Sequence, residues 1–264
     1  NTVYNQVKTN MEKNKKIAVI TGASSGLGKE FVKQISALHT VEEIWVIARR
    51  KELLEQLQET TDIPVKVLPL DLTKTEDIYQ LENAYHAELP DIKILVNAAG
   101  MGKTGTFETQ TLSSIHSMMD LNCKALIDVT KISIPFLSRG STIYQISSIA
   151  SFQPMPNFAI YSASKAFVTN FSLALQKELQ PKGVHVVCVC PYWVTDTQFI
   201  SIANTTTYYK HKVITTTSDR VVKKALRKRN GICTPDIVST LERGMSKILP
   251  HSMLACIMQK ISTF

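Results

Sequence analysis

Six short apolar runs rich in valine and isoleucine recur along the chain, and they constrain its fold more than any other feature of the sequence. Runs of this length and composition are typical of strands buried on both faces, and amphipathic helical patterns lie between them. Right-handed βαβ crossovers then predict an α/β fold, with a doubly wound parallel sheet of about seven strands and helices on both faces. The runs are IAVIT (17–21), IWVIA (44–48), VKVLPL (65–70), IKILVN (92–97), TIYQIS (142–147) and VHVVCVC (184–190).

The expected organisation is one large domain of the Rossmann type. With 264 residues, 44% of them hydrophobic, the chain can bury a substantial core without disulfides or metal. We expect residues 1–14 to be a flexible polar leader and residues 15–264 to form a single domain. No apolar run approaches the ~20 residues of a membrane helix, so no membrane span is predicted. Helices are expected near 26–39, 50–60, 74–88, 112–138, 158–180 and 217–229, followed by a last strand at 231–234 and a helical tail over 235–260.

The five cysteines indicate neither a disulfide framework nor a metal site. Their number is odd, and no CxxC pair or histidine-rich neighbour accompanies them. Cys188 and Cys190 share one face of a buried-strand pattern, so we interpret them as core residues rather than as ligands. A reducing, cytoplasmic setting fits this usage best.

The net charge of +8 raises the question of a polyanionic partner, because much of it gathers in residues 210–229. In this segment Val221, Val222 and Ala225 fall at helical spacing. The basic residues are therefore explained most simply as the solvated face of an amphipathic helix. Attraction of an anionic cofactor or substrate is the second interpretation and nucleic acid the third, so no nucleic-acid partner is predicted.

A glycine-rich turn, TGASSGLG, directly follows the first expected strand and opens the first expected helix. Gly22, Gly26 and Gly28 would allow a tight turn and a close approach of the backbone to a pyrophosphate, whose charge the N-terminus of the helix attracts. Ser24 and Ser25 lie inside the same turn and are counted with the cofactor-binding residues. The alternative is an ordinary βα loop, because the spacing differs from GxGxxG. We predict a dinucleotide site.

Two arginines favour NADP(H) over NAD(H). About twenty residues after the glycine turn, where a site for NAD would carry a carboxylate, the sequence has Ala48, Arg49 and Arg50. Guanidinium groups at this place would pair with a 2′-phosphate. The alternative is that both arginines only cover the surface before the next helix.

Tyr161 and Lys165 stand four positions apart in an expected helix, so they would share one face. An ammonium close to a phenol in a dehydrated site favours phenolate and would lower the pKa of the tyrosine towards the working pH of an acid–base catalyst. The alternative is a chance pair whose lysine extends to water.

Five motifs occur together along the chain: TGASSGLG, NAAG, LNCKA, ISS and YSASK. In this order and spacing the chain resembles the short-chain dehydrogenase/reductase family over residues 17 to about 197. The resemblance implies that Asp71 holds the adenine amino group and that Asn97 to Gly100 shape the floor beside the adenosine ribose. The implied catalytic tetrad is Asn122, Ser148, Tyr161 and Lys165.

Each member of the tetrad has a role implied by the resemblance. Tyr161 would donate a proton to the ketone oxygen, and Ser148 would position the carbonyl. Ser147 should point the other way, because alternate strand residues face opposite sides. Lys165 would lower the pKa of Tyr161 and bind the nicotinamide ribose. Asn122 would hold a water that relays protons to Lys165.

The chain departs from the family pattern after the sixth strand, where PYWVTDTQF replaces Pro-Gly-x-x-x-Thr. Tyr192 stands at the glycine and Asp196 at the threonine, which leaves open whether Thr195 or Thr197 meets the cofactor carboxamide. The Pro-Tyr variant is similar to that of hydroxysteroid dehydrogenases and very-long-chain 3-ketoacyl reductases. Apolar candidate substrate loops at 151–158, 192–193 and 199–209 suit a steroid, bile acid or acyl chain. Alternatively, their side chains only pack under loops or at a subunit contact; these are Phe152, Met155, Phe158 and Phe199.

The predicted function is that of an NADP(H)-dependent oxidoreductase that interconverts a hydrophobic ketone and a secondary alcohol. The alternative is a non-catalytic NADP(H)-binding sensor or scaffold on the same fold, which would have no use for the complete tetrad. A homodimer or homotetramer is expected, because the two long helices at 112–138 and 158–180 carry more apolar positions than one sheet face needs.

Overall fold

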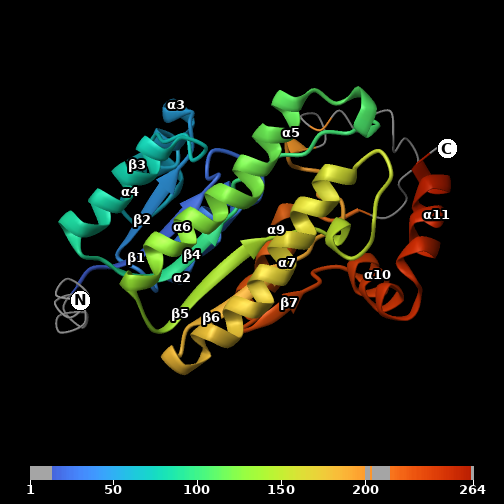
Figure 1. The fold of residues 1–264 in the computed structure, drawn as a ribbon. Coiled ribbons are helices and arrows are strands. Elements are labelled where there is room, and N and C mark those ends of the chain that lie inside the picture. Colours follow the sequence, from blue (N-terminus) through green and yellow to red (C-terminus); the bar gives the residue numbers. More distant parts are fainter. Residues whose placement is uncertain (1–13, 200–202, 204–214, 263–264) are drawn as a thin grey trace.

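A parallel sheet with helices on both sides organises the computed structural model, which describes residues 14–199, 203 and 215–262 (Figure 1). Within these residues the strand order is β3-β2-β1-β4-β5-β6-β7, and each neighbouring pair is parallel. The doubly wound fold is therefore confirmed. The strands are β1 (Lys16–Thr21), β2 (Glu43–Ile47), β3 (Val65–Leu68), β4 (Asp91–Asn97), β5 (Leu137–Ile146), β6 (His185–Val189) and β7 (Gly231–Cys233).

Both faces of the sheet are buried, as the near-continuous apolar runs predict. In β1, Ala18 and Ile20 pack on one side, whereas Ile17 and Val19 pack on the other. This alternation follows from the two-residue period of a strand. Helices α2 (Gly26–Leu38) and α9 (Ser218–Arg227) cover the first side, and α4 (Thr75–Glu88), α6 (Ala125–Ser133) and α7 (Ala159–Leu179) cover the second.

The strand order reverses between β1 and β4. The chain leaves β1 in one direction to build β2 and β3, and returns to build β4 on the other side of β1. Crossover connections diverge at such a point and leave a crevice at the carboxyl ends of the strands, where ligands bind in doubly wound sheets. The glycine turn follows β1, and the Asn97–Gly100 segment follows β4, so both lie at this edge.

The prediction of one continuous helix over 112–138 is wrong, because the segment is interrupted and ends earlier than expected. It consists of α5 (Leu112–Met119), a π-helical turn (Asp120–Lys124), α6 and a short 3₁₀ turn (Ile134–Phe136). Strand β5 then begins at Leu137, five residues before the expected strand. Pro135 lies in the 3₁₀ turn and cannot supply the N–H that would continue the helix.

Two other expected helices are shorter than predicted. The segment expected over 50–60 forms only α3 (Lys51–Glu55) and a 3₁₀ turn (Gln58–Thr60). The tail expected over 235–260 divides into α10 (Ile237–Ile248) and α11 (His251–Ser262), which lie together at one end of the molecule (Figure 1). The break falls at Pro250, whose ring prevents a continuous helix.

The described part of the basic segment is an amphipathic helix, as expected. Val221, Val222 and Ala225 of α9 are fully buried against α2, whereas Lys223 and Lys224 are exposed. Cys188 and Cys190 are buried in the core, which agrees with their interpretation as core residues. The expected leader, up to residue 13, and most of the candidate loop at 199–209 lie outside the described residues.

A buried polar network links β4, β5 and α6 below the carboxyl edge of the sheet. The Thr130 hydroxyl accepts hydrogen bonds from Asn97 Nδ2 at 2.9 Å and from Gln145 Nε2 at 3.1 Å, and it donates to the Leu126 carbonyl at 2.6 Å. Gln145 Oε1 also accepts from Asn97 Nδ2 at 3.0 Å. The network fixes the end of β4 relative to β5, and thereby the loop that leaves β4.

Thr130→Val should destabilise the protein by about 1–3 kcal/mol, because it removes an acceptor shared by two buried amides without changing the volume. Thr130→Ser keeps the hydroxyl and is the matched control. Urea unfolding of both variants measures the difference. Equal stability of the valine and serine variants would show that the shared acceptor contributes nothing.

Candidate active site

The backbone of the glycine turn packs directly against neighbouring backbone at the carboxyl end of β1. Gly22 has φ +65°, and a Cβ there would lie 2.8 Å from the Ala99 nitrogen. A Cβ on Gly28 would lie 2.3 Å from the Gly22 carbonyl oxygen. No side chain fits at either position. The backbone therefore reaches the edge unobstructed, and the N-terminus of α2 begins with Ser25 as an N-cap whose side chain makes no capping hydrogen bond. This arrangement fits the pyrophosphate of a dinucleotide.

Arg50 reaches across to the glycine turn. Its Nη2 donates to Ser24 Oγ at 3.0 Å and to Ser25 Oγ at 3.4 Å, and its Nη1 donates to Gln198 Oε1 at 3.4 Å. Arg49 is exposed beside it. Both guanidinium groups thus belong to the rim of the turn, in positions where they can meet an anionic group on the adenosine side of a dinucleotide.

Asp71 follows β3 at the same edge and is ionised. Burial raises the pKa of this carboxyl, but hydrogen bonds from the Thr73 hydroxyl (2.8 Å) and amide (3.2 Å) and the charges of Arg49 and Lys74 outweigh burial, so the pKa is lowered. A carboxylate held in this way can accept a hydrogen bond from an amino group.

The segment after β4 supports the site through its backbone. The side chain of Asn97 is buried in the Thr130 network and points into the protein rather than to the edge. Ala98 and Ala99 instead abut Gly22, and Gly100 lies between two tetrad side chains. A Cβ on Gly100 would lie 3.2 Å from Asn122 Oδ1 and 3.3 Å from Lys165 Nζ.

Asn122 holds the loop after β4. It lies in the π-helical turn, and such turns redirect side chains within a helix and often occur at functional sites. Its Oδ1 accepts from the Met101 amide at 2.8 Å, and its Nδ2 donates to the Met101 carbonyl at 2.9 Å and to Ser164 Oγ at 3.0 Å. The observed contacts therefore give Asn122 a positioning role, and the expected water relay stays a prediction.

Tyr161, Ser148 and Lys165 come together at the carboxyl edge. Tyr161 and Lys165 lie on one face of the first turns of α7, and the Ser148 side chain lies near enough to the phenol to lower its pKa. Ser148 Oγ accepts from the Ala150 amide at 3.2 Å. Ser147 faces the other way, as expected, because its hydroxyl donates to the Lys165 carbonyl at 2.9 Å.

The expected lowering of the phenol pKa by Lys165 is wrong for this structure. Burial raises the pKa of Tyr161, and the nearby Ser148 side chain only partly opposes this rise. Burial also lowers the pKa of Lys165 to about 8. The ammonium donates to the Ile146 carbonyl at 2.9 Å and lies 5.7 Å from the centre of the phenol ring. The phenol is consequently neutral at neutral pH and can act as a proton donor.

Apolar side chains enclose Tyr161. The Phe158 ring lies 4.4 Å from the Tyr161 ring, centre to centre, and the Phe199 ring lies 5.3 Å away. Gly102 permits this closure, because a Cβ there would lie 2.7 Å from the Phe199 ring. The other members of this cluster, which we call the Tyr161 cluster, are Met101, Met118, Ala150, Met155, Ile160, Ala203 and Met258.

The candidate substrate residues divide between two clusters. Met155, Phe158 and Phe199 belong to the Tyr161 cluster, whereas Phe152 packs with Tyr192 against the buried Cys188–Cys190 region, which is the alternative of packing under loops. Gly102 and Met258 are not among the site residues predicted from the sequence. Gly102 directly follows the NAAG motif and could have been suspected, but Met258 lies about a hundred residues after Tyr161 in the chain and had no local signal.

Asp196 is hydrogen-bonded to the start of α9 and is not free in the site. Its carboxylate accepts from the Ser218 amide at 2.8 Å and from the Ser218 hydroxyl at 2.7 Å. The hydroxyls of Thr195 and Thr197 also have backbone partners, the Thr216 carbonyl at 3.3 Å and the Val194 carbonyl at 3.0 Å. The structure therefore favours neither threonine for a cofactor contact.

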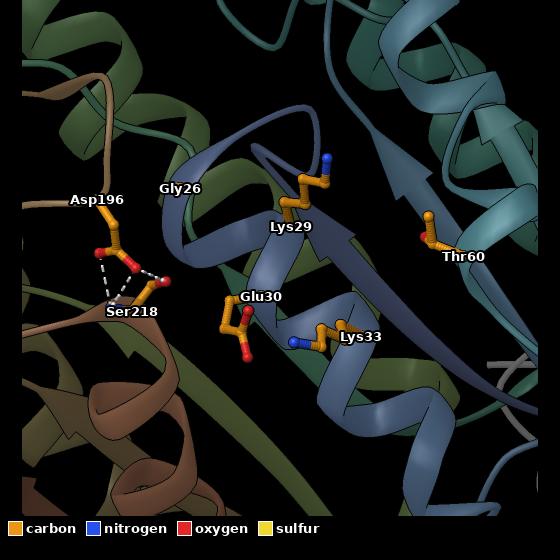
Figure 2. A pocket seen from close by; sticks show the side chains of 7 residues that line it. All are labelled: Gly26, Lys29, Glu30, Lys33, Thr60, Asp196 and Ser218. Carbon is orange, nitrogen blue, oxygen red and sulfur yellow. Dashed lines mark hydrogen bonds between the residues drawn. The ribbon is translucent and has the colours of Figure 1, made fainter.

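A cavity of about 380 Å³ lies beside α2. Figure 2 shows Asp196 and Ser218, which line it, on one side of the helix and Thr60 on the other. Charges of both signs line it, because Lys29, Lys33 and Glu30 project from the same helix as Gly26. Within the described residues, no group of three or more histidine, cysteine or acidic side chains could hold a metal ion. No helix in the same part of the chain is long and apolar enough to cross a bilayer.

The chain is about one third identical to two families of named oxidoreductases. The mouse 17-beta-hydroxysteroid dehydrogenase type 3 is 31% identical over 251 residues, which are 92% of this chain and 75% of the mouse protein. The very-long-chain 3-oxoacyl-CoA reductase of Anas platyrhynchos is 34% identical over 187 residues, which are 67% of this chain and 59% of the duck protein.

Solved structures agree with the fold. A short-chain dehydrogenase from Sphingobium yanoikuyae in complex with NADPH matches with a TM-score of 0.74 and 26% identity, over 89% of this chain and 96% of that one. One from Burkholderia phymatum in complex with NAD, at 17% identity, matches with a TM-score of 0.75 over 88% of this chain and 92% of that one, and supports the fold alone. The profile described as short chain dehydrogenase matches residues 16–206, and the chain therefore belongs to the short-chain dehydrogenase/reductase family of oxidoreductases.

Proposed function

We propose that the protein is an NADP(H)-dependent oxidoreductase that interconverts a hydrophobic ketone and a secondary alcohol. The observation that carries this proposal is the buried Tyr161 phenol, which lies near Ser148 and is enclosed by Phe158 and Phe199. A proton donor in a water-poor, apolar site beside a dinucleotide cradle suits carbonyl reduction, where negative charge develops on one oxygen.

The residues at the edge of the sheet fit a bound dinucleotide phosphate. The glycine turn would hold the pyrophosphate, Asp71 would accept from the adenine amino group, and Arg49 and Arg50 would pair with a 2′-phosphate. The arginines support NADP(H) over NAD(H), since no carboxylate at the end of β2 takes the place that binds a free 2′-hydroxyl. The relative from S. yanoikuyae binds NADPH.

The chemistry on the protein side is proton delivery. A reduced nicotinamide bound at this edge would supply the hydride for the carbonyl carbon. Tyr161 would donate its phenol proton to the carbonyl oxygen, and Ser148 would donate a hydrogen bond to the same oxygen, so that the ketone becomes a secondary alcohol. In oxidation, the tyrosinate would accept the hydroxyl proton while the hydride passes to the oxidised nicotinamide. Lys165 would bind the nicotinamide ribose and restore the proton to Tyr161 after reduction.

The substrate class follows from the lining of the site. Methionine and phenylalanine side chains of the Tyr161 cluster present no charge to a substrate, and they suit a steroid, bile acid or 3-oxoacyl chain. The names of the mouse and duck relatives agree with the steroid and acyl types. The competing proposal, a non-catalytic NADP(H) sensor or scaffold, leaves the assembly of Ser148 with Tyr161 and Lys165 without a purpose.

Assembly into a homodimer or homotetramer is part of the proposal. Three large apolar side chains remain exposed on the outer side of the sheet's helical layer, namely Ile127 of α6 and Phe167 and Leu173 of α7. Pairing of these helices about a two-fold axis would bury them.

Gly28→Ala should abolish dinucleotide binding, because the added methyl group would collide with the Gly22 carbonyl and displace the turn. The matched control is Gly244→Ala in the interior of α10, where a Cβ meets nothing within 4 Å. There the alanine should leave binding unchanged and stabilise the helix by about 0.5–1 kcal/mol. Fluorescence titration with NADPH measures binding; an affinity of the Gly28 variant equal to that of the control would contradict the assignment of the cradle.

NADPH should bind at least about tenfold more tightly than NADH, which corresponds to about 1.4 kcal/mol. Arg49→Asp should reverse this preference, because a carboxylate repels the 2′-phosphate and accepts from the 2′-hydroxyl. Lys177→Asp, on the exposed end of α7, makes the same change in net charge away from the site and should not alter the ratio. Equal affinities of the unmutated protein for the two cofactors would refute the preference.

Tyr161→Phe should lower kcat by about 10²–10⁴ and change NADPH affinity by only a few-fold, since it removes the proton donor but not the cofactor contacts. Tyr79→Phe, at an exposed position of α4, is the control. Because burial raises the phenol pKa, ketone reduction should proceed at neutral pH, whereas alcohol oxidation should rise as the pH increases towards that pKa. A screen over steroids and 3-oxoacyl thioesters that follows NADPH absorbance supplies the substrate. Near-normal turnover of Tyr161→Phe would exclude Tyr161 as the acid.

A further inference from the structure

Helix α10 carries a row of apolar side chains on its exposed face. Ile237, Leu241, Met245 and Ile248 recur at intervals of four and three residues, which places them on one side of the helix. They are 75%, 62%, 44% and 83% exposed, and Met253 of the adjoining α11 is 49% exposed. We call these five side chains the apolar stripe. Single exposed apolar residues are ordinary, but a continuous row of this size marks a contact surface.

The polar side of α10 faces the protein. Ser239 is fully buried and completes a capping box with Asp236 at the start of the helix. Glu242 is half-buried, and its carboxylate accepts from Gln153 Nε2 at 3.0 Å. Helices on a protein surface normally bury their apolar side and expose their polar side. In α10, polar contacts hold the polar side of the helix against the protein, so the apolar stripe faces away from the protein.

The charged side chains exposed on α10 and α11 are positive. In residues 237–260, where the structure describes the side chains, Lys247 and Lys260 are exposed, Arg243 is half-buried, and His251 is exposed between the two helices. The single acid of this segment is Glu242, which is turned inwards to Gln153. The stripe is thus an apolar row with a cationic border.

We propose that the apolar stripe docks on the surface of a lipid bilayer that contains anionic headgroups. Apolar side chains enter the boundary between headgroups and acyl chains, and the basic border meets the lipid phosphates and carboxylates. A second copy of this chain fits less well. In a two-fold contact the same patch meets itself, so two basic borders would meet without an exposed acid of this segment to pair with.

Docking would bring the active site close to the lipid. In α11, Met253 belongs to the stripe, whereas Leu254 is buried and Met258 packs in the Tyr161 cluster. One helix therefore contacts both the proposed bilayer surface and the apolar surroundings of the proton donor. An apolar substrate dissolved in the bilayer would have a short path to the site. This consequence rests on the proposed function, but docking itself does not.

The test is sedimentation of the full chain with vesicles, which needs no catalytic turnover. The probes are vesicles of phosphatidylcholine alone and of phosphatidylcholine with phosphatidylserine at roughly 7:3, at low and at high salt. The test variant is Leu241→Glu with Ile248→Glu. The matched control is Leu38→Glu with Tyr79→Glu, which adds the same charge at two exposed apolar positions, 51% and 58% exposed, on α2 and α4.

The unmutated chain and the control should bind the phosphatidylserine vesicles at least about tenfold more tightly than the test variant. Lys247→Gln should weaken binding to these vesicles and reduce the effect of salt. Failure of the unmutated chain to bind, or equal binding by the test variant and the control, would overturn the proposal. Light scattering gives the mass in parallel: a smaller assembly in the test variant alone would identify the stripe as a contact between copies and would equally overturn it.

Discussion

The contact between the backbones of Gly22 and Gly28 sets the geometry on which the rest of the carboxyl edge depends. A Cβ on Gly28 would come within 2.3 Å of the Gly22 carbonyl, so the first turn of α2 lies directly on the end of β1. Gly22 in turn touches the backbone of Ala98 and Ala99 after β4. At the strand-order reversal between β1 and β4, the edge of the sheet is therefore narrow and free of side chains. Arg50, for which we propose a cofactor contact, is positioned by its hydrogen bond to Ser24 in this turn.

Burial determines the chemical character of the tetrad more than the Tyr161–Lys165 pairing does. Removing both groups from water favours their neutral forms, which raises the pKa of the phenol and lowers that of the ammonium to about 8. A pair in which the proton stays on the phenol suits reduction at neutral pH. The apolar rings of Phe158 and Phe199 that cause this burial also line the proposed substrate site, so the proposed preference for apolar ketones and the protonation of the phenol have one physical origin.

The fold was predictable because its signals are local and repeated. Strands buried on both faces produce uniform apolar runs. The glycine turn and the YSASK motif are each only a few residues long, so the residues within each motif lie close together once the sheet forms. The end of the 112–138 helix was misplaced because apolar periodicity continues through Pro135 into β5. Met258 and Gly102 escaped notice because their roles arise only from packing between distant segments. The sign of the Tyr161 pKa shift depends on burial, which a sequence does not report.

Helix α10 shows why periodicity alone does not assign the buried side of a helix. Its apolar row at 237, 241, 245 and 248 would ordinarily be taken as the side that packs on the sheet. The capping box at Asp236 and the hydrogen bond from Gln153 to Glu242 fix the helix the other way round. Burial of Glu242 raises the pKa of its carboxyl, so this orientation costs desolvation as well as apolar exposure. An apolar surface that covers the outer side of α10 would remove the cost of exposing the apolar row and so stabilise the helix further. The basic border of α10 and α11 favours a surface that is also anionic.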